Sequence, residues 1–110
     1  MITVTFTESG NKLSLRVEGH AGYAEHGQDI VCAAASILAY TVSAFIKEAE
    51  RCGDLKTAPT IKTESGDVTI SCEPTDAAYH AMQSAFHFAL AGYALLKHNY
   101  PQCVSLHDLT

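Results

Sequence analysis

A histidine and a cysteine that could act together lie within residues 19–36, which read GHAGYAEHGQDIVCAAAS. His20 precedes a glycine-containing loop, and Cys32 begins a long apolar segment. A thiol is a strong nucleophile only as the thiolate, and both a helix N-terminus and a nearby imidazole favour that form. The order of these residues predicts that Cys32 is a nucleophile and that His20 is its general base, or its imidazolium partner and proton donor.

Three alternatives to this pairing stay open. Cys32 could be only a half-exposed small residue in the first turn of a helix. His26 lies in the same loop and competes with His20 for the role of base, although the end of a strand anchors His20 better. His20, His26, Asp29 and Cys32 are also competent zinc ligands. Their spacing matches no tight Cys/His pattern and the chain has no CxxC, so we expect no metal and no cofactor.

Asp29 lies three residues before Cys32, which is the spacing of an N-cap that accepts the Cys32 N–H. Its carboxylate would also disfavour the thiolate, so orienting His20 or contacting substrate is the alternative role. The cap is the preferred interpretation because aspartate is common at that position. If Cys32 attacks a carbonyl, the backbone N–H of Cys32 or Ala33 could stabilise the oxyanion.

Three glycines, Gly19, Gly22 and Gly27, lie in or beside the loop that carries the histidines. They could let the loop open for a peptide and close over it. Ordinary turns with positive φ would require the same residue type, and both interpretations can hold.

The hydrophobic pattern predicts the elements that must position these residues. Alternating residues joined by short glycine turns predict two hairpins, with strands at 2–7, 13–18, 60–64 and 67–73. A helix is predicted at 30–52, ended by Gly53, and a second helix is predicted to follow a cap at Thr75 or Asp76 and to run to about Asn99. Residues 103–109 alternate weakly and could add an edge strand. The order ββαββα predicts an α+β fold: one domain over residues 1–110, with an antiparallel sheet of four or five strands and two long helices on one face.

Composition narrows the class of protein. With 110 residues, 47% hydrophobic and 17% charged, the chain suits one globular domain. A net charge of -5 argues against sequence-independent binding of nucleic acid. The chain opens with an alternating strand and not with a signal peptide, and no apolar run reaches the roughly 18 residues that span a bilayer. We therefore expect a cytoplasmic protein with reduced cysteines and no membrane partner.

A helical wheel distinguishes Cys32 from the other thiols. It gathers an apolar sector of Ala35, Leu38, Val42, Phe45, Ile46 and Ala49. It places Cys32 on the opposite side, with Ser36, Tyr40, Ser43, Lys47 and Glu50. Cys52, at the edge of the apolar sector, and Cys72, in phase with inward strand residues, are predicted to pack in the core. The role of Cys103 is open.

The histidines of the second predicted helix, His80, His87 and His98, share one face. The simplest interpretation is a solvated face without a catalytic role. Ala91 and Ala94 lie on the same side and would allow close approach, so this face could also serve self-association.

The segment GHAGYAEHGQDIVCAAAS resembles the signature of the ribosomal-processing cysteine proteases, the Prp family. The resemblance covers nearly the whole chain and implies a small α+β domain that acts as a homodimer. It implies that His20 and Cys32 form the catalytic pair and that Asp29 falls on a further signature position. It also implies a substrate: the N-terminal extension of the large-subunit ribosomal protein L-twenty-seven, cut beside an aromatic pair.

Two other functions remain open beside this endopeptidase. The chain could be a non-enzymatic module that binds a ribosomal protein, with Cys32 incidental. It could also be a thiol redox sensor, although no cysteine close to Cys32 in the sequence could resolve an oxidised thiol.

Overall fold

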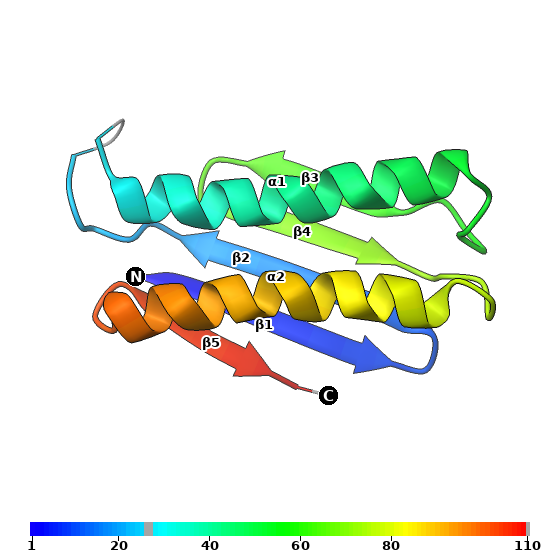
Figure 1. The fold of residues 1–110 in the computed structure, drawn as a ribbon. Helices are drawn as coiled ribbons and strands as arrows, with labels where there is room; N and C mark the ends of the chain where they lie inside the picture. Colours follow the sequence, from blue (N-terminus) through cyan, green and yellow to red (C-terminus); the bar gives the residue numbers. More distant parts are fainter. Residues whose placement is uncertain (26–27, 110) are drawn as a thin grey trace.

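In the computed structural model, which describes residues 1–25 and 28–109, two helices lie side by side on one face of a five-stranded sheet (Figure 1). The strands are β1 (Ile2–Ser9), β2 (Lys12–Gly19), β3 (Thr60–Glu64), β4 (Asp67–Cys72) and β5 (Val104–Asp108). The helices are α1 (Ile30–Arg51) and α2 (Tyr79–Asn99). This arrangement confirms the predicted α+β fold class.

The strands pair in the order β3-β4-β2-β1-β5. Both predicted hairpins form, and β2 pairs antiparallel with β4. The fifth strand exists and lies at an edge, but it pairs parallel with β1, with Val104 beside Ile2, so the sheet is mixed and not wholly antiparallel. The reason is α2, which carries the chain along the sheet and delivers β5 to the start of β1 (Figure 1).

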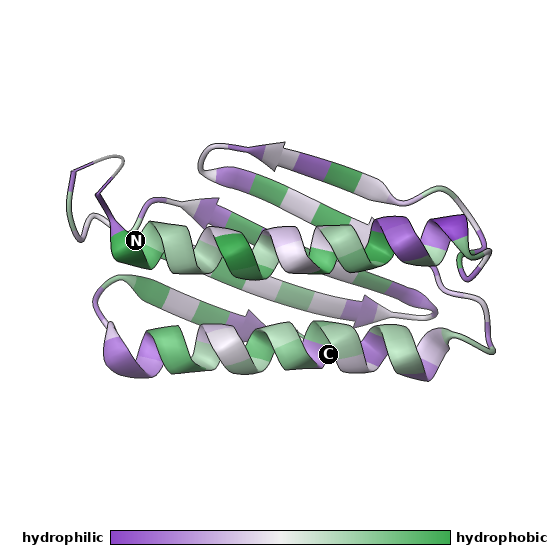
Figure 2. Ribbon diagram, turned by 45° about the horizontal axis from the view of Figure 1, so that its top comes forward, coloured by the Kyte–Doolittle hydropathy of each residue, from purple (hydrophilic) through white to green (hydrophobic). Residues whose placement is uncertain are grey.

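The core lies between the sheet and the helix pair. Apolar residues alternate with polar ones along the strands (Figure 2), and the inward side chains of Phe6 and Leu15 are fully buried. Phe6 packs on Phe86 of α2, with ring centroids 5.6 Å apart. Tyr93 of α2 is also buried, and its hydroxyl donates a hydrogen bond of 2.9 Å to the Ala35 carbonyl of α1. The two helices are therefore tied to each other as well as to the sheet.

The buried face of α1 differs from the face that the wheel predicts. Its buried residues are Val31, Ala35, Ala39, Val42, Ser43, Ile46 and Ala49. Phe45 is exposed and Ser43 is buried, which corrects both predictions. The buried face of α1 is rich in small residues, and Phe45 lies outside it. By length and composition alone α1 could cross a membrane, but a core helix passes the same test, and here it packs on the sheet.

Two further predictions need correction. The N-cap of the second helix is Ala78 and not Thr75 or Asp76, because Thr75 caps a preceding turn, where its hydroxyl accepts the Ala78 N–H at 3.3 Å. Cys52 is exposed and not packed in the core, whereas Cys72 is buried as predicted. All four cysteines are free thiols, and Cys103 is half-buried. The three histidines of α2 are exposed, as expected.

Candidate active site

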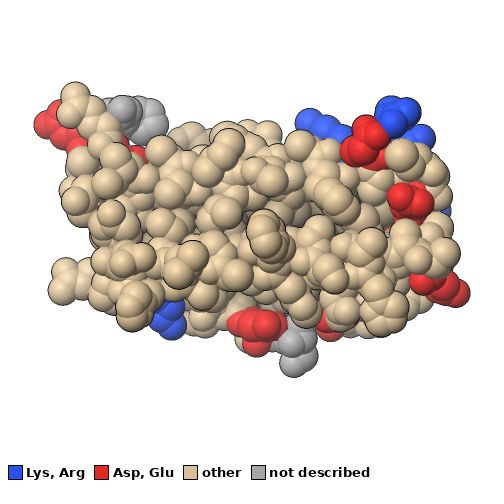
Figure 3. Space-filling model, viewed as in Figure 1, with Lys and Arg blue, Asp and Glu red and all other residues tan. Residues whose placement is uncertain are grey.

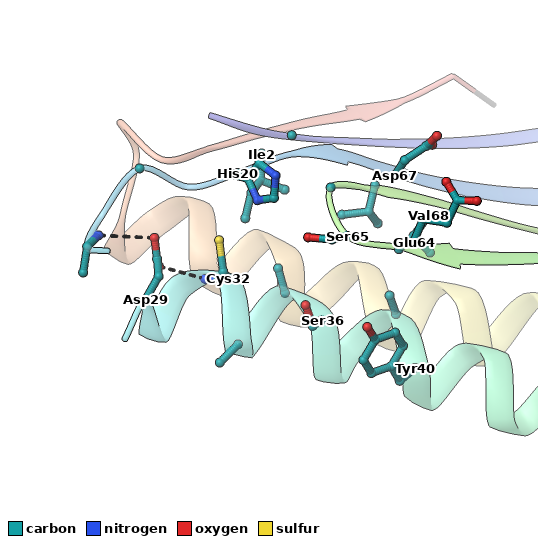
Figure 4. A pocket seen from close by; sticks show the side chains of 18 residues that line it. Ile2, His20, Asp29, Cys32, Ser36, Tyr40, Glu64, Ser65, Asp67 and Val68 are labelled. Carbon is teal, nitrogen blue, oxygen red and sulfur yellow. Dashed lines mark hydrogen bonds between the residues drawn. The ribbon is translucent and has the colours of Figure 1, made fainter. Parts of the chain in front are cut away.

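A pocket of about 600 Å³ opens where three segments far apart in the sequence meet. They are the end of β2 with the loop after it, the first turns of α1, and the turn between β3 and β4 (Figure 4). His20 and Cys32 both line this pocket. The structure thus brings the two predicted residues to one cavity.

Cys32 lies in the first turn of α1 and is half-buried against the edge of the core. It does not point straight away from the core, as the wheel predicts, but into the pocket, on the side where His20 lies (Figure 4). Its Sγ accepts a hydrogen bond of 3.2 Å from the Ala21 N–H. Because Ala21 is buried and directly follows His20, this bond ties the thiol to the segment that carries the imidazole.

His20 is an exposed residue just beyond the end of β2. The backbone before it is fixed, because the Gly19 N–H donates to the Gly66 carbonyl at 2.9 Å. Gly19 has φ +89°, and a Cβ there would overlap the Met1 carbonyl, so only glycine fits. The rival base His26 and the third loop glycine, Gly27, lie outside the described residues.

Asp29 is the N-cap of α1, as the sequence predicts. Its Oδ1 accepts the N–H groups of Val31 and Cys32, both at 3.0 Å. Its Oδ2 accepts the N–H groups of Tyr23 at 3.0 Å and Ala24 at 3.3 Å. Among the described residues these partners are all backbone groups, and His20 is not one of them. One buried carboxylate therefore holds both the helix that carries the nucleophile and the loop that follows His20.

The two backbone N–H groups that were predicted to stabilise the oxyanion already donate hydrogen bonds to Asp29. The Cys32 N–H is bonded to Asp29 Oδ1, and the Ala33 N–H donates to the Asp29 carbonyl at 3.0 Å. Neither group is free in this geometry, which corrects the prediction. The physical reason is that Asp29 opens a regular helix, whose first turn already uses both N–H groups.

The loop after β2 is held at further points. Gly22 has φ +68°, so the turn explanation for the glycines holds at Gly19 and Gly22. The ring of Tyr23 packs edge-on against Tyr100, with centroids 5.4 Å apart, and this contact joins the loop to the residue after α2.

Sequence reasoning did not identify two walls of the pocket. One is a stripe on α1 in which Ser36 and Tyr40 follow Cys32 at steps of four residues, with Ala35 and Ala39 beside it. The helical wheel places Ser36 and Tyr40 on the same side as Cys32, but it does not show that this side lines a pocket.

The second missed wall is the turn between β3 and β4, where Glu64, Ser65, Gly66 and Asp67 line the pocket. Lys62 binds Asp67 at 2.7 Å, and this hydrogen bond lowers the pKa of Asp67. The negative charge that Glu64 and Asp67 bring to this wall is therefore partly neutralised by Lys62. No local pattern links this turn to His20, because the two meet only through the pairing of β2 with β4.

A family model described as "Cysteine protease Prp" matches residues 1–105, a span that contains every pocket-lining residue. The chain belongs to the Prp cysteine protease family. It is therefore a cysteine protease, as the sequence predicts. No curated protein matches the chain.

Solved structures agree with membership of the Prp family. The ribosomal processing protease Prp of Staphylococcus aureus, in complex with a covalently linked product peptide, is 26% identical with a TM-score of 0.75, and the match covers 98% of this chain and 99% of that chain. SMU.848 from Streptococcus mutans is 29% identical with a TM-score of 0.69, covering 100% and 95%. A further structure of S. aureus Prp, with a substrate peptide, is 24% identical with a TM-score of 0.68, covers 98% and 99%, and supports the fold.

In this Prp family member, replacing Asp29 by alanine is expected to lower the Tm by roughly 5–10 °C, because helix and loop lose their acceptor together. Burial alone would raise the pKa of Asp29, but the four backbone N–H groups outweigh it and lower the pKa below its ordinary value. The stabilisation is therefore complete above the ordinary carboxyl pKa and is lost as the pH falls through the lowered one.

Thermal unfolding from about pH 7 to about pH 2 measures this dependence on the ionised carboxylate. Asp29→Asn is the matched variant, since it keeps one oxygen for the helix cap and has no charge to lose. Its Tm should fall less steeply with acid than that of the unmodified protein. Equal acid dependence in the two proteins would contradict the role of the Asp29 carboxylate.

Proposed function

We propose that this chain is a processing endopeptidase that removes the N-terminal extension of the large-subunit ribosomal protein L-twenty-seven. The observation that carries the proposal is that a free thiol, Cys32, and His20 line the same open pocket, which we also call the groove because it runs along α1. From Cys32 to Tyr40 the groove follows eight residues of α1, about 12 Å, which accommodates three to four residues of an extended peptide. The S. aureus relative is a ribosomal processing protease that binds peptides.

The proposed mechanism uses Cys32 and His20 in turn. The Cys32 thiolate attacks the carbonyl carbon of the scissile peptide bond and forms a C–S bond. The C–N bond then breaks as the His20 imidazolium protonates the leaving amine, which yields a thioester. His20 next takes a proton from water, the hydroxide attacks the thioester, and the thiol departs with that proton. The Ala21 N–H already donates to Sγ, so it stabilises the negative charge on the sulfur while Cys32 is a thiolate.

The walls of the groove suit an apolar substrate segment. Val17, Ala35, Ala39 and Val68 contribute apolar surface to the pocket. The small alanine side chains leave depth above the helix, where a large side chain can be buried. This fits the aromatic pair that the resemblance to the Prp family implies at the cleavage point.

A peptide assay tests the proposed substrate. A synthetic peptide spanning the extension and the first residues of the mature ribosomal protein should yield two products by mass spectrometry, with one cut beside the aromatic pair. The control peptide carries alanines in place of that pair and should stay intact. Binding without cleavage would favour the non-enzymatic module, and equal cleavage of both peptides would refute the proposed specificity.

The proposed site of action is the cytoplasm, where newly made ribosomal proteins are present. The four free thiols of the chain suit that compartment, because its reducing conditions preserve a catalytic cysteine.

We further propose that the chain acts as a homodimer through the outer face of the helix layer, where Ile37, Phe45, Phe88 and Leu95 are exposed. Figure 3 shows this face with charged side chains mainly near its ends. Residues 30–46 of α1 and 79–96 of α2 contain no Asp, Glu, Lys or Arg. A helix exposed to water normally carries charges on its outer side, so such a face is typical of one that is covered.

The size and the charge of the outer face of the helix layer favour a second copy of this chain as the partner that covers it. The molecule measures 42 × 24 × 16 Å between Cα atoms, so the face exceeds the roughly 800 Å² that each partner of a standard interface buries. Each chain carries a net charge of -5, and two such chains repel one another least where they meet through a neutral face.

Sedimentation velocity tests the dimer. The unmodified protein should sediment at twice its 11.8 kDa, and Leu95→Glu should sediment as a monomer. Leu109→Glu is the matched control, because Leu109 is 63% exposed and Leu95 is 64% exposed, but Leu109 lies beyond β5 and away from this face. A monomeric unmodified protein would contradict the proposal, and a monomer that sediments with lipid vesicles would assign the face to a membrane.

A further inference from the structure

The turn of the second hairpin lies directly against the ring of His20. Gly66 occupies that turn with φ +72°, and a Cβ built on it would lie 2.7 Å from His20 Nε2 and 3.1 Å from Cε1. Real Cβ atoms essentially never come within 3.0 Å of another heavy atom. The imidazole therefore occupies space that exists only because residue 66 has no side chain.

Gly66 also holds the backbone from which His20 projects. Its carbonyl accepts the Gly19 N–H at 2.9 Å, one step beyond the last β2–β4 pair, Glu18 with Asp67. The same residue thus fixes the chain immediately before His20 and borders its ring. The hydrogen bond fixes the backbone that carries His20, and the close approach of Gly66 limits where the His20 ring can point.

We propose that Gly66 is a positioning residue for His20 and holds the imidazole at the angle that the reaction with Cys32 needs. This inference rests on the proposed function, in which His20 transfers the proton. His20 is exposed and follows the end of a strand, so without such a support its ring would sample several rotamers. General base catalysis requires the base within hydrogen-bond reach of the proton, and a displacement of about 1 Å can lower the rate about 100-fold.

The first hairpin supplies a matched control. Gly10 also lies in a two-residue turn, between the pair Ser9 and Lys12, and has φ +60°, but a Cβ there meets nothing within 4 Å. Gly10→Ala and Gly66→Ala both place a side chain at a positive φ, and only the second substitution reaches the imidazole. Because the ring can swing aside, Gly66→Ala should still fold. Gly66→Asn and Gly10→Asn form a second pair, since asparagine tolerates positive φ better and retains the Cβ.

Steady-state cleavage and NMR of the His20 ring test the proposal together. Both Gly66 variants should lower kcat about 100-fold with KM nearly unchanged and should shift the His20 Cε1–H signal. Both Gly10 variants should retain kcat within about twofold and leave that signal in place. Unchanged kcat or an unchanged His20 signal in the Gly66 variants would overturn the proposal. If the unmodified protein does not cut the ribosomal peptide, the kinetics use another peptide that it cuts, and the proposed substrate fails separately from the role of Gly66.

Discussion

Replacing Cys32 by alanine is expected to lower kcat by about four orders of magnitude or more, because removing a nucleophile leaves only binding and background hydrolysis. The fold should persist. Cys32 is only half-buried, and alanine fills most of its space in the first turn of α1. Two measurements test this: the rate at which the variant cleaves the extension peptide, and its affinity for the same peptide.

Cys103→Ala is the matched control, since Cys103 is also a half-buried free thiol but does not line the pocket. It should cleave at the unmodified rate. Retained binding with lost cleavage in Cys32→Ala would support both recognition and chemistry. Cleavage by Cys32→Ala at the unmodified rate would refute the assignment of the nucleophile.

His20→Ala is expected to lower kcat about 1000-fold, which is within the range that a positioned acid and base contributes. His26→Ala provides the comparison within the same loop and should retain most activity. Equal loss in the two variants would contradict the choice of His20, and loss in His26→Ala alone would reassign the base. Alkylation of Cys32 by iodoacetamide, measured in all three proteins, separates loss of thiolate from loss of substrate binding.

The elements of this fold are predictable because their signals are local. Alternation places β1 and β2, and the turn glycines Gly10 and Gly66 mark both hairpins. The parallel pairing of β5 is not predictable in this way, since it depends on where α2 delivers the chain. The predicted cap of α2 is also two or three residues too early, because Thr75 caps a turn that only precedes the helix.

The candidate site is predictable in its residue types but not in its geometry. Periodicity finds one apolar sector on α1, but it does not say which part of that sector the sheet covers. Phe45 of that sector is exposed, Ser43 outside the sector is buried, and Cys32 lines the pocket. The oxyanion prediction fails for a related reason, because Asp29 at the cap uses the same N–H groups. The contact of Gly66 with His20 spans 46 positions of sequence and leaves no local signal.

The long separation between the segments of the pocket has a consequence for biosynthesis. Both His20 and Cys32 are translated before the β3–β4 turn. Pairing of β2 with β4 is a non-local step, which folds later than the local β1–β2 hairpin. A nascent chain therefore exposes its thiol before the wall beside the imidazole exists. If Gly66 positions His20 as proposed, full peptide-cutting activity requires the docked second hairpin, and an unfinished chain is expected to cut peptides slowly.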